Sequence, residues 1–198
     1  LAQRNVQIWL LGYLRHRRRV RRLPRVDGTR HMMFCFVDHY EPLAGGADEA
    51  RATARVARWA RDYPELARRH RDSTGRPPQH TFFYPEEEYR ASFLKPIERL
   101  CGDGWGEVEI HLHHDDDTEA GLRHKLGEFL RRLDADHGLV PKQDGAYRYA
   151  FIHGNWALDN SRPDGRWCGV DNEIGALVET GCYADMTMPS APSDSGNS

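Results

Sequence analysis

Apolar and polar positions follow two different periods along the chain, and together they predict alternating strands and helices. Runs of consecutive apolar residues, such as 31–37 and 80–84, are typical of strands buried in a parallel sheet. Longer stretches repeat their apolar residues every three or four positions, most clearly Leu122 and Leu126 within residues 118–136. The predicted order is helix 4–23, strand 31–37, helix 47–71, strand 80–84, helix 87–100, strand 107–112, helix 118–136, strand 147–153, helix 170–180 and strand 182–188. Strands that alternate with helices in this way indicate an α/β fold with a parallel sheet.

Polar residues stand at the ends of three of the predicted strands. The clusters are Asp38-His39, His113-His114-Asp115 and His153-Gly154-Asn155. Sites in parallel α/β folds collect at the carboxyl ends of the strands, because these ends share one edge of the sheet. We therefore expect the three clusters to lie near one another.

The composition narrows the class of protein. The chain has 198 residues, which fits one domain or part of a larger one, and 39% of them are hydrophobic. A formal net charge of −2 argues against a general nucleic-acid binder, and no apolar run approaches the roughly 20 residues of a membrane span. The four cysteines show no CxxC spacing, so we expect reduced thiols rather than disulfides or a cysteine-type zinc site. A cytoplasmic or membrane-peripheral location is favoured over secretion, and the sequence indicates no oligomeric state.

The two ends of the chain differ from this pattern. Residues 1–29 are expected to form a basic N-terminal helix and extension, because the helical pattern runs into the arginine-rich segment 15–22. Such a segment either contacts an anionic lipid or polymer or is a solvated helix outside the core, and the solvated helix is favoured. Residues 189–198 are too polar to pack and are expected to be a disordered tail or the point where a longer protein was interrupted.

The segment 108–117 is the most informative part of the sequence. Side chains alternate along a strand, so Glu109, His111 and His113 are expected on one side of it. Two imidazoles followed by the carboxylates of residues 115–117 offer nitrogen and oxygen donors to a divalent cation. The alternative is a histidine-rich surface loop, and one of the three aspartates is also expected to cap the helix that follows. Metal binding is favoured, because so many titratable groups gather at one strand end.

Other residues at strand ends leave alternatives open. Asp38 follows an apolar run, where a carboxylate is partly desolvated unless it is paired, and a functional role is favoured over a turn. His153 is interpreted equally well as a functional residue or as a core histidine. Asn155 suits contacts to sugar hydroxyls or a turn, whereas Trp156 suits a sugar-stacking platform or, as is favoured, a lid of the core.

These segments stand in an order that resembles a known family. Phe36-Val37-Asp38-His39 is similar to the Thr-Phe-Asp-Asp-Gly motif that ends the first barrel strand of the NodB-type polysaccharide deacetylases. Residues 109–118 stand where that family has its His-x-x-x-His metal motif. Residues 151–156 and 182–190 resemble the fourth and the next strand of a divergent branch. The resemblance covers about residues 30–193.

The resemblance implies a fold and a site. The family fold is a distorted (β/α) barrel of about seven strands, of which residues 30–188 would form an incomplete portion. The implied site residues are Asp38 as the catalytic base, His39, His113, Asp117 and His111 as metal ligands, and His153, Asn155 and Trp156 as substrate-binding residues. The family's late histidine motif, which supplies a general acid, would lie beyond Ser198.

The implied activity is that of a zinc-dependent hydrolase that removes acetyl groups from a polysaccharide or amino sugar. Its partner would be an acetylated polysaccharide or oligosaccharide, with no nucleic acid and no integral membrane segment. One alternative is another metal-dependent barrel hydrolase, a phosphoesterase or glycosidase, with Glu109 or Glu41 as an additional carboxylate. A second alternative is a non-catalytic metal- or carbohydrate-binding fragment. The sequence has no GxSxG, Walker or GxGxxG motif, so a serine hydrolase or a phosphate-cradling loop has no support.

Overall fold

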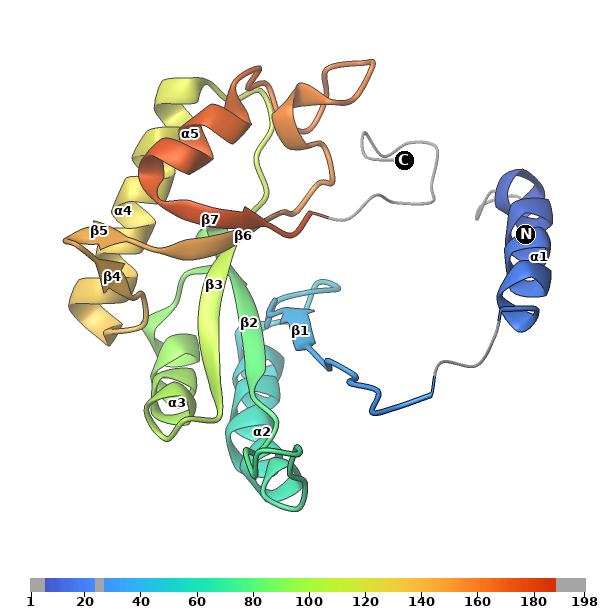
Figure 1. Cartoon of the computed structure of the whole chain (residues 1–198). Helices are drawn as coiled ribbons and strands as arrows, with labels where there is room; N and C mark the ends of the chain where they lie inside the picture. Colours follow the sequence, from blue (N-terminus) through green and yellow to red (C-terminus); the bar gives the residue numbers. More distant parts are fainter. Residues whose placement is uncertain (1–5, 24–26, 188–198) are drawn as a thin grey trace.

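The computed structural model describes residues 6–23 and 27–187 of the chain. Its main feature is one sheet of five parallel strands, whose order in space, β1-β2-β3-β6-β7, is also their order along the chain (Figure 1). The strands are β1 (Phe36–His39), β2 (His80–Pro85), β3 (Gly106–Leu112), β6 (Tyr149–His153) and β7 (Cys182–Asp185). The α-helices are α1 (Val6–Arg21), α2 (Glu49–Ala67), α3 (Ala91–Gly102), α4 (Glu119–His137) and α5 (Glu173–Thr180). The remaining elements are the antiparallel pair β4 (Lys142–Gln143) and β5 (Ala146–Tyr147), and the short 3-10 helices η2 (Glu86–Glu88) and η3 (Leu158–Asn160).

Helices α2 to α5 cover one face of this sheet. Their apolar stripes pack with the even-numbered residues of β2 and β3, such as Phe82 and Ile110, in one core. The opposite face carries a smaller apolar cluster of Phe83, Ala150 and Ile152. Right-handed connections between strands that follow one another in chain order put every connecting helix on the same side, which accounts for this division. The predicted α/β fold with a parallel sheet is confirmed.

Strands β1 and β7 are the two edges of the sheet in the described part of the chain. Strands in chain order with helices on one face are the arrangement of a (β/α) barrel wall, whereas the strand order of a doubly wound sheet reverses. The incomplete barrel therefore stays a prediction with which the strand order is consistent. The tail predicted at residues 189–198 lies outside the described residues.

Local signals in the sequence set the ends of the long helices. Asp48 caps α2, because its side chain accepts a hydrogen bond from the backbone N–H of Arg51 at 2.8 Å. Thr118 caps α4 in the same way, accepting from the backbone N–H of Gly121 at 3.1 Å. Helix α4 is followed by Gly138, whose φ of 62° lies in the left-handed region. The prediction of an aspartate cap for this helix was wrong, since the threonine that follows the three aspartates is the cap.

The apolar run at residues 31–37 does not form the buried strand that its pattern predicts. Residues 31–35 lie outside the sheet, and Met33 is 93% exposed. Strand β1 starts only at Phe36 and is an edge strand, so its outer side has no neighbour to bury it. An apolar run alone does not distinguish a central strand from an exposed segment near an edge, because burial depends on the neighbours. His39 consequently lies within the strand and not after it.

The N-terminal helix α1 carries basic residues in its last turn, namely Arg18, Arg19 and Arg21. Nearly all of its described side chains are exposed, including the apolar Trp9 and Leu11. No helix in the described part of the chain is both long enough and apolar enough to cross a membrane.

The helix-free face of the sheet buries one carboxyl group. Glu109 of β3 accepts hydrogen bonds from the backbone N–H of Ala150 at 2.5 Å and from the hydroxyl of Tyr183 at 2.6 Å. Burial raises the pKa of Glu109 to about 7, because removal from water penalises the charged form. At pH values between the ordinary carboxyl pKa and this raised pKa, Glu109 is therefore protonated in the folded chain and ionised in the unfolded chain.

The wild type should become less stable as pH rises, and the substitution Glu109→Gln should abolish this pH dependence. A raised carboxyl pKa favours the unfolded state at high pH, so the wild-type free energy of unfolding should fall relative to the variant by about 2 kcal/mol between pH 5 and 8. Glutamine keeps both contacts, because its oxygen accepts from Ala150 and its amide donates to Tyr183. Urea unfolding at the two pH values measures the difference. Glu107→Gln, at an exposed position of the same strand, is the control, and equal pH dependence in both variants would contradict the assignment.

Candidate functional site

Two groups of metal-type side chains lie at the carboxyl ends of the strands. The first, which we call the open cluster, consists of His39, Glu41, His111 and His113. The second, which we call the closed cluster, consists of His114, His153, Cys168 and Glu173. Strand ends β1, β3 and β6 contribute to them, so the strand-end residues that the sequence singles out do meet at one edge of the sheet (Figure 1).

The open cluster gathers three imidazoles around one carboxylate oxygen. Oε1 of Glu41 lies 3.1 Å from Nε2 of His111, 3.4 Å from Nδ1 of His39 and 4.0 Å from Nε2 of His113. The ring centroids are 4.4 Å apart for His39 and His111, and 4.6 Å apart for His111 and His113. Nitrogen and oxygen ligands at about 2.0–2.1 Å from a tetrahedral zinc ion lie roughly 3.3 Å from one another. The contacts of Glu41 with His111 and His39 are of this size, and His113 lies somewhat farther away.

Hydrogen bonds fix the tautomers of two of these histidines. Nδ1 of His111 lies 2.9 Å from the backbone carbonyl oxygen of Ile152, which only accepts, so Nδ1 carries the proton. Nδ1 of His113 contacts the carboxylate of Glu87 in the same manner. In its neutral form each ring then presents a free Nε2 lone pair toward Glu41. A histidine whose Nδ1–H is held by a carbonyl or carboxylate is the usual metal ligand.

The charges of the open cluster suit a cation. Contacts of Oε1 with the imidazoles of His111 and then of His39 hold the pKa of Glu41 far below its ordinary value, so Glu41 is ionised. Because His111 keeps its proton on Nδ1, its Nε2 and the carboxylate are two facing acceptors that a cation would bridge. Burial lowers the pKa of His111, which keeps this ring neutral at physiological pH. The hydrogen bond to Glu87 raises the pKa of His113. The raised pKa means that the surroundings of His113 favour a positive charge on the ring. A bound metal cation would supply this charge in place of the proton.

The open cluster borders a cavity. His111 is fully buried, whereas the side chain of His113 is 35% exposed. A cavity of about 730 Å³ lies between β1 and α2, and its lining includes Asp38, His39, Glu41, Trp59 and His80. A ligand in this cavity would meet the cluster at His39 and Glu41.

Asp38 is near the open cluster but not in it. Neighbouring side chains of a strand point to opposite faces, and Asp38 lies on the helix side of β1, where its carboxylate is 3.0 Å from Nε2 of His80. His39 takes the other side, against His111. The structure thus brings together His39, His111 and His113 of the predicted set, and it places Asp38 across the strand, on the shared cavity.

Asp117, expected as a ligand beside His39 and His113, lies elsewhere. Its Oδ2 is 2.8 Å from Nζ of Lys125 and 3.3 Å from Nδ1 of His114. The physical reason is a turn at Asp116, whose φ is 47°, which directs the chain toward the cap of α4. Asp117 therefore belongs to the surroundings of the closed cluster.

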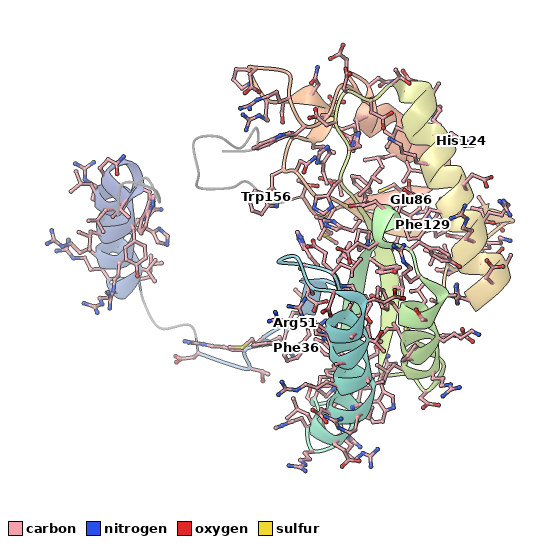
Figure 2. All side chains as sticks on the ribbon, turned by 180° about the vertical axis from the view of Figure 1, so that it is seen from behind. Phe36, Arg51, Glu86, His124, Phe129 and Trp156 are labelled. Atoms are coloured by element: carbon pink, nitrogen blue, oxygen red, sulfur yellow. The ribbon has the colours of Figure 1, made fainter. Side chains whose placement is uncertain are left out.

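The three residues expected at the substrate also differ from expectation. His153 is fully buried within the closed cluster and has no surface for a sugar. The amide of Asn155 donates to the carbonyl oxygens of His114 at 2.9 Å and Trp167 at 3.4 Å, so it ties its loop to the end of β3. Trp156 is 41% exposed, with a φ of 53°, so it is not the lid of the core that was favoured (Figure 2).

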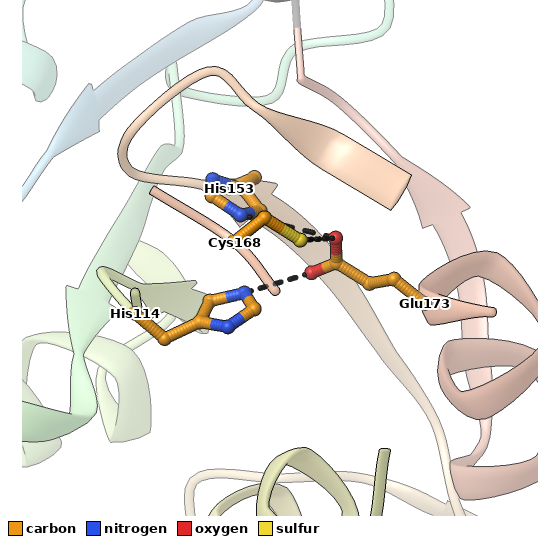
Figure 3. Close-up of side chains that lie close together, drawn as sticks. All are labelled: His114, His153, Cys168 and Glu173. Atoms are coloured by element: carbon orange, nitrogen blue, oxygen red, sulfur yellow. Dashed lines mark hydrogen bonds and ion pairs between the residues drawn. The ribbon is translucent and has the colours of Figure 1, made fainter. Parts of the chain in front are cut away.

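The closed cluster is assembled from four separate places in the chain (Figure 3). His114 follows β3, His153 ends β6, Cys168 lies in the loop after β6, and Glu173 is the first residue of α5. All four are buried. Glu173 is central, with Oε1 3.0 Å from Nε2 of His114, and Oε2 3.3 Å from Sγ of Cys168 and 3.8 Å from Nε2 of His153.

Sequence reasoning missed Cys168 and Glu173 entirely. A lone cysteine in a loop and an acidic residue in the first turn of a helix are ordinary features, and neither carries a metal signal by itself. Glu41 was considered only as an additional carboxylate. Glu87, one of three consecutive glutamates in η2, gave no signal, because its contact to His113 arises only when β2 and β3 pair.

The substitution Gly154→Ala should weaken metal binding by the open cluster. A Cβ at this position would lie 2.3 Å from Cδ2 of His113, so the ring must leave its place beside Glu87. Loss of such an orienting contact typically lowers metal affinity roughly ten-fold or more. The variant should retain about one equivalent of Zn²⁺ fewer than the wild type against a competing chelator. Gly127→Ala is the control, since a Cβ there meets nothing within 4 Å, and equal zinc retention in both variants would argue against a metal role for His113.

Comparisons with protein-family models, with curated proteins and with solved structures found no match for this chain. The function of the chain is therefore inferred from its own residues. The open cluster, with its oriented imidazoles and its adjoining cavity, is the site on which that inference rests.

Proposed function

We propose that the open cluster binds a divalent cation, with zinc as the expected metal, and that the chain is, or is part of, a metal-dependent hydrolase. One observation carries the proposal: the free Nε2 atoms of His111 and His113 converge on Glu41, while each Nδ1 is held by an acceptor. This is how oriented histidine ligands of metal sites are built. We propose His111, His113 and Glu41 as the three protein ligands. The cavity reaches Glu41 and His39, so a fourth coordination position can stay open for substrate or water, as in catalytic zinc sites.

Each residue around the cluster has its own proposed role in hydrolysis. When bound, the cation would polarise the carbonyl group of the scissile bond and lower the pKa of water beside it. Glu87 orients the ring of His113 through Nδ1. Asp38 lines the same cavity, and we propose that it accepts the proton from the attacking water. Its contact to Nε2 of His80 at 3.0 Å holds the carboxylate in place.

The substrate class is proposed from the resemblance and from the cavity wall. The resemblance to polysaccharide deacetylases implies an N- or O-acetylated sugar. The cavity offers the aromatic side chains Trp59 and Tyr63 beside the charged Asp38, Arg58 and Asp62. Aromatic faces pack against the apolar faces of sugar rings, and charged groups hydrogen-bond their hydroxyls.

A phosphoesterase is the second candidate, because Arg58 lines the same cavity as His39 and Glu41. A cationic side chain that faces a metal site is what a phosphate ester requires and an acetyl group does not. Release of acetate or of phosphate from matched substrates separates the two activities. Metal binding without either release would instead support the non-catalytic fragment.

The substitution His113→Ala should remove about one equivalent of metal and lower acetate release at least 100-fold, because the cluster loses an oriented ligand. The assay uses the full chain reconstituted with Zn²⁺, acetylated amino-sugar oligomers as substrate, and plasma mass spectrometry for the metal. His124→Ala is the matched control and should retain both properties, because His124 is exposed on α4 (Figure 2), which covers the other face of the sheet. Equal metal content and activity in both variants would contradict the proposed site.

The substitution Asp38→Asn should separate metal binding from turnover. The variant should keep its zinc, because Asp38 lies on the far side of β1 from the cluster, while kcat should fall by about 10²–10⁴, the usual range for a general base. Asp103→Asn, at an exposed position after α3 that does not line the cavity, is the control. Loss of zinc in Asp38→Asn would assign Asp38 as a ligand, and an unchanged kcat would exclude it as the base.

A further inference from the structure

A simple hydrogen-bond network leaves two buried ring nitrogens of the closed cluster without a partner among the described residues, Nδ1 of His114 and Nε2 of His153. Within such a network Glu173 is satisfied, since it accepts from the backbone N–H of Asp159 at 2.7 Å, from Nε2 of His114 at 3.0 Å and from Sγ of Cys168 at 3.3 Å. His153 is not satisfied. Its Nε2 is buried, has no hydrogen-bond partner among the described residues, and points toward Glu173 across 3.8 Å. Buried polar atoms without a partner are rare and call for a specific cause.

The sulfur of Cys168 is prepared to carry negative charge. The backbone N–H groups of Asn160 and Val170 point at Sγ, at 3.3 Å and 3.5 Å. Hydrogen bonds donated to a sulfur favour its thiolate form, which is the form that binds metals. Burial, and then the charge of Glu173, nevertheless raise the pKa of Cys168 to about 12, so coordination has to displace the thiol proton.

The separations between the four side chains are close to those of ligands around one zinc ion. Bonds of about 2.0–2.3 Å to nitrogen, oxygen and sulfur imply ligand separations of roughly 3.3–3.8 Å. The contacts to Glu173 measure 3.0 Å at Oε1 and 3.3 Å and 3.8 Å at Oε2, and one ligand atom from each of the four residues lies within 4.8 Å of the others. One thiolate and one carboxylate also neutralise a divalent cation, which a buried site requires.

We propose that the closed cluster is a second metal site, distinct from the proposed hydrolytic site, and that it binds Zn²⁺ through His114, His153, Cys168 and Glu173. Two nitrogens, one sulfur and one oxygen in tetrahedral array form a donor set that zinc accepts readily. Four protein ligands fill the coordination sphere and leave no position for substrate, so the role of this ion is structural.

The surroundings of the closed cluster complete a ligand environment. Nδ1 of His114 lies 3.3 Å from Oδ2 of Asp117, which Lys125 holds at 2.8 Å, but it makes no hydrogen bond in this position. A small rotation of the ring would complete a carboxylate–histidine–metal arrangement. Coordination through Nε2 of His153 moves its ring proton to Nδ1. The backbone N–H of Asn155, which now donates to that Nδ1 at 3.2 Å, has to turn aside.

A zinc ion at this place would fasten the loop between β6 and α5 to the sheet. Its four ligands join the end of β3, the end of β6, the loop and the start of α5. His153 also borders the open cluster, because the next residue, Gly154, lies under the ring of His113. Binding free energy at a site that exists only in the folded chain stabilises the fold, so removal of this ion should lower the unfolding temperature.

The test is a Co²⁺ titration of the metal-free full chain, followed by absorption spectroscopy. A bond between Co²⁺ and a thiolate gives an intense charge-transfer band in the near ultraviolet, and the open cluster contains no cysteine. The wild type should bind two equivalents, one of which produces this band. Saturation with Co²⁺ without the band would overturn the proposal, whether or not any variant folds.

Variants assign the band to one site. Cys168→Ser should bind one equivalent fewer and lose the band, whereas Cys101→Ser, a half-buried thiol of α3, should keep it. His113→Ala should lose one equivalent but keep the band, so failure of the open cluster and failure of the closed cluster give different results. Persistence of the band in folded Cys168→Ser would contradict the assignment.

Discussion

The pairing of β3 with its two neighbours is the constraint on which both clusters depend. In the pairing with β6, His111 stands opposite Ile152 and Leu112 stands opposite His153. This register places the carbonyl of Ile152 where it fixes the tautomer of His111, and it brings the end of β6 beside the residues that follow β3. A slip of one residue would exchange the two faces of the sheet and disperse the imidazoles. The geometry of the candidate site is therefore set by the register of the sheet more than by the loops.

The two clusters offer similar donor atoms to a metal but differ in their access to solvent and substrate. The open cluster lies on the helix-free side of the sheet, borders a cavity and keeps part of His113 in contact with solvent. The closed cluster is sealed by its own loop and by α5. Access to solvent and substrate is what distinguishes a catalytic metal site from a structural one, since both are built from the same side chains. This difference in access supports the proposal of hydrolysis at the first cluster and of stabilisation at the second.

Much of the fold could be predicted from the sequence, because it follows from periodicity alone. The alternation of apolar runs and helical stripes gave the parallel sheet, and the alternation within β3 correctly put His111 and His113 on one face. Edge position could not be predicted in this way. The run at residues 31–37 is apolar enough for a central strand, yet residues 31–35 remain outside the sheet because β1 has a neighbour on one side only. The resulting shift placed Asp38 within a strand and turned it away from His39.

The parts of the site that could not be predicted all arise from tertiary contacts. Asp117 was assigned to the wrong cluster because the turn at Asp116 has no clear sequence signal. Glu173 looks like an ordinary acidic residue at a helix start, and only the fold shows that it is buried against His114 and Cys168. The sequence identifies the side chains that could ligate a metal, whereas the fold determines which of them lie close enough to bind the same ion.

The central claim is that His111, His113 and Glu41 converge to hold a cation beside the cavity. Anomalous X-ray scattering at the zinc edge, from crystals of the full chain loaded with Zn²⁺, tests this directly. The account predicts an anomalous peak within bonding distance, roughly 2.0–2.1 Å, of Nε2 of His111 and Nε2 of His113, with Glu41 as an oxygen ligand. Crystals that contain zinc but show no peak there, or in which Nε2 of either histidine is turned away from Glu41, would contradict it.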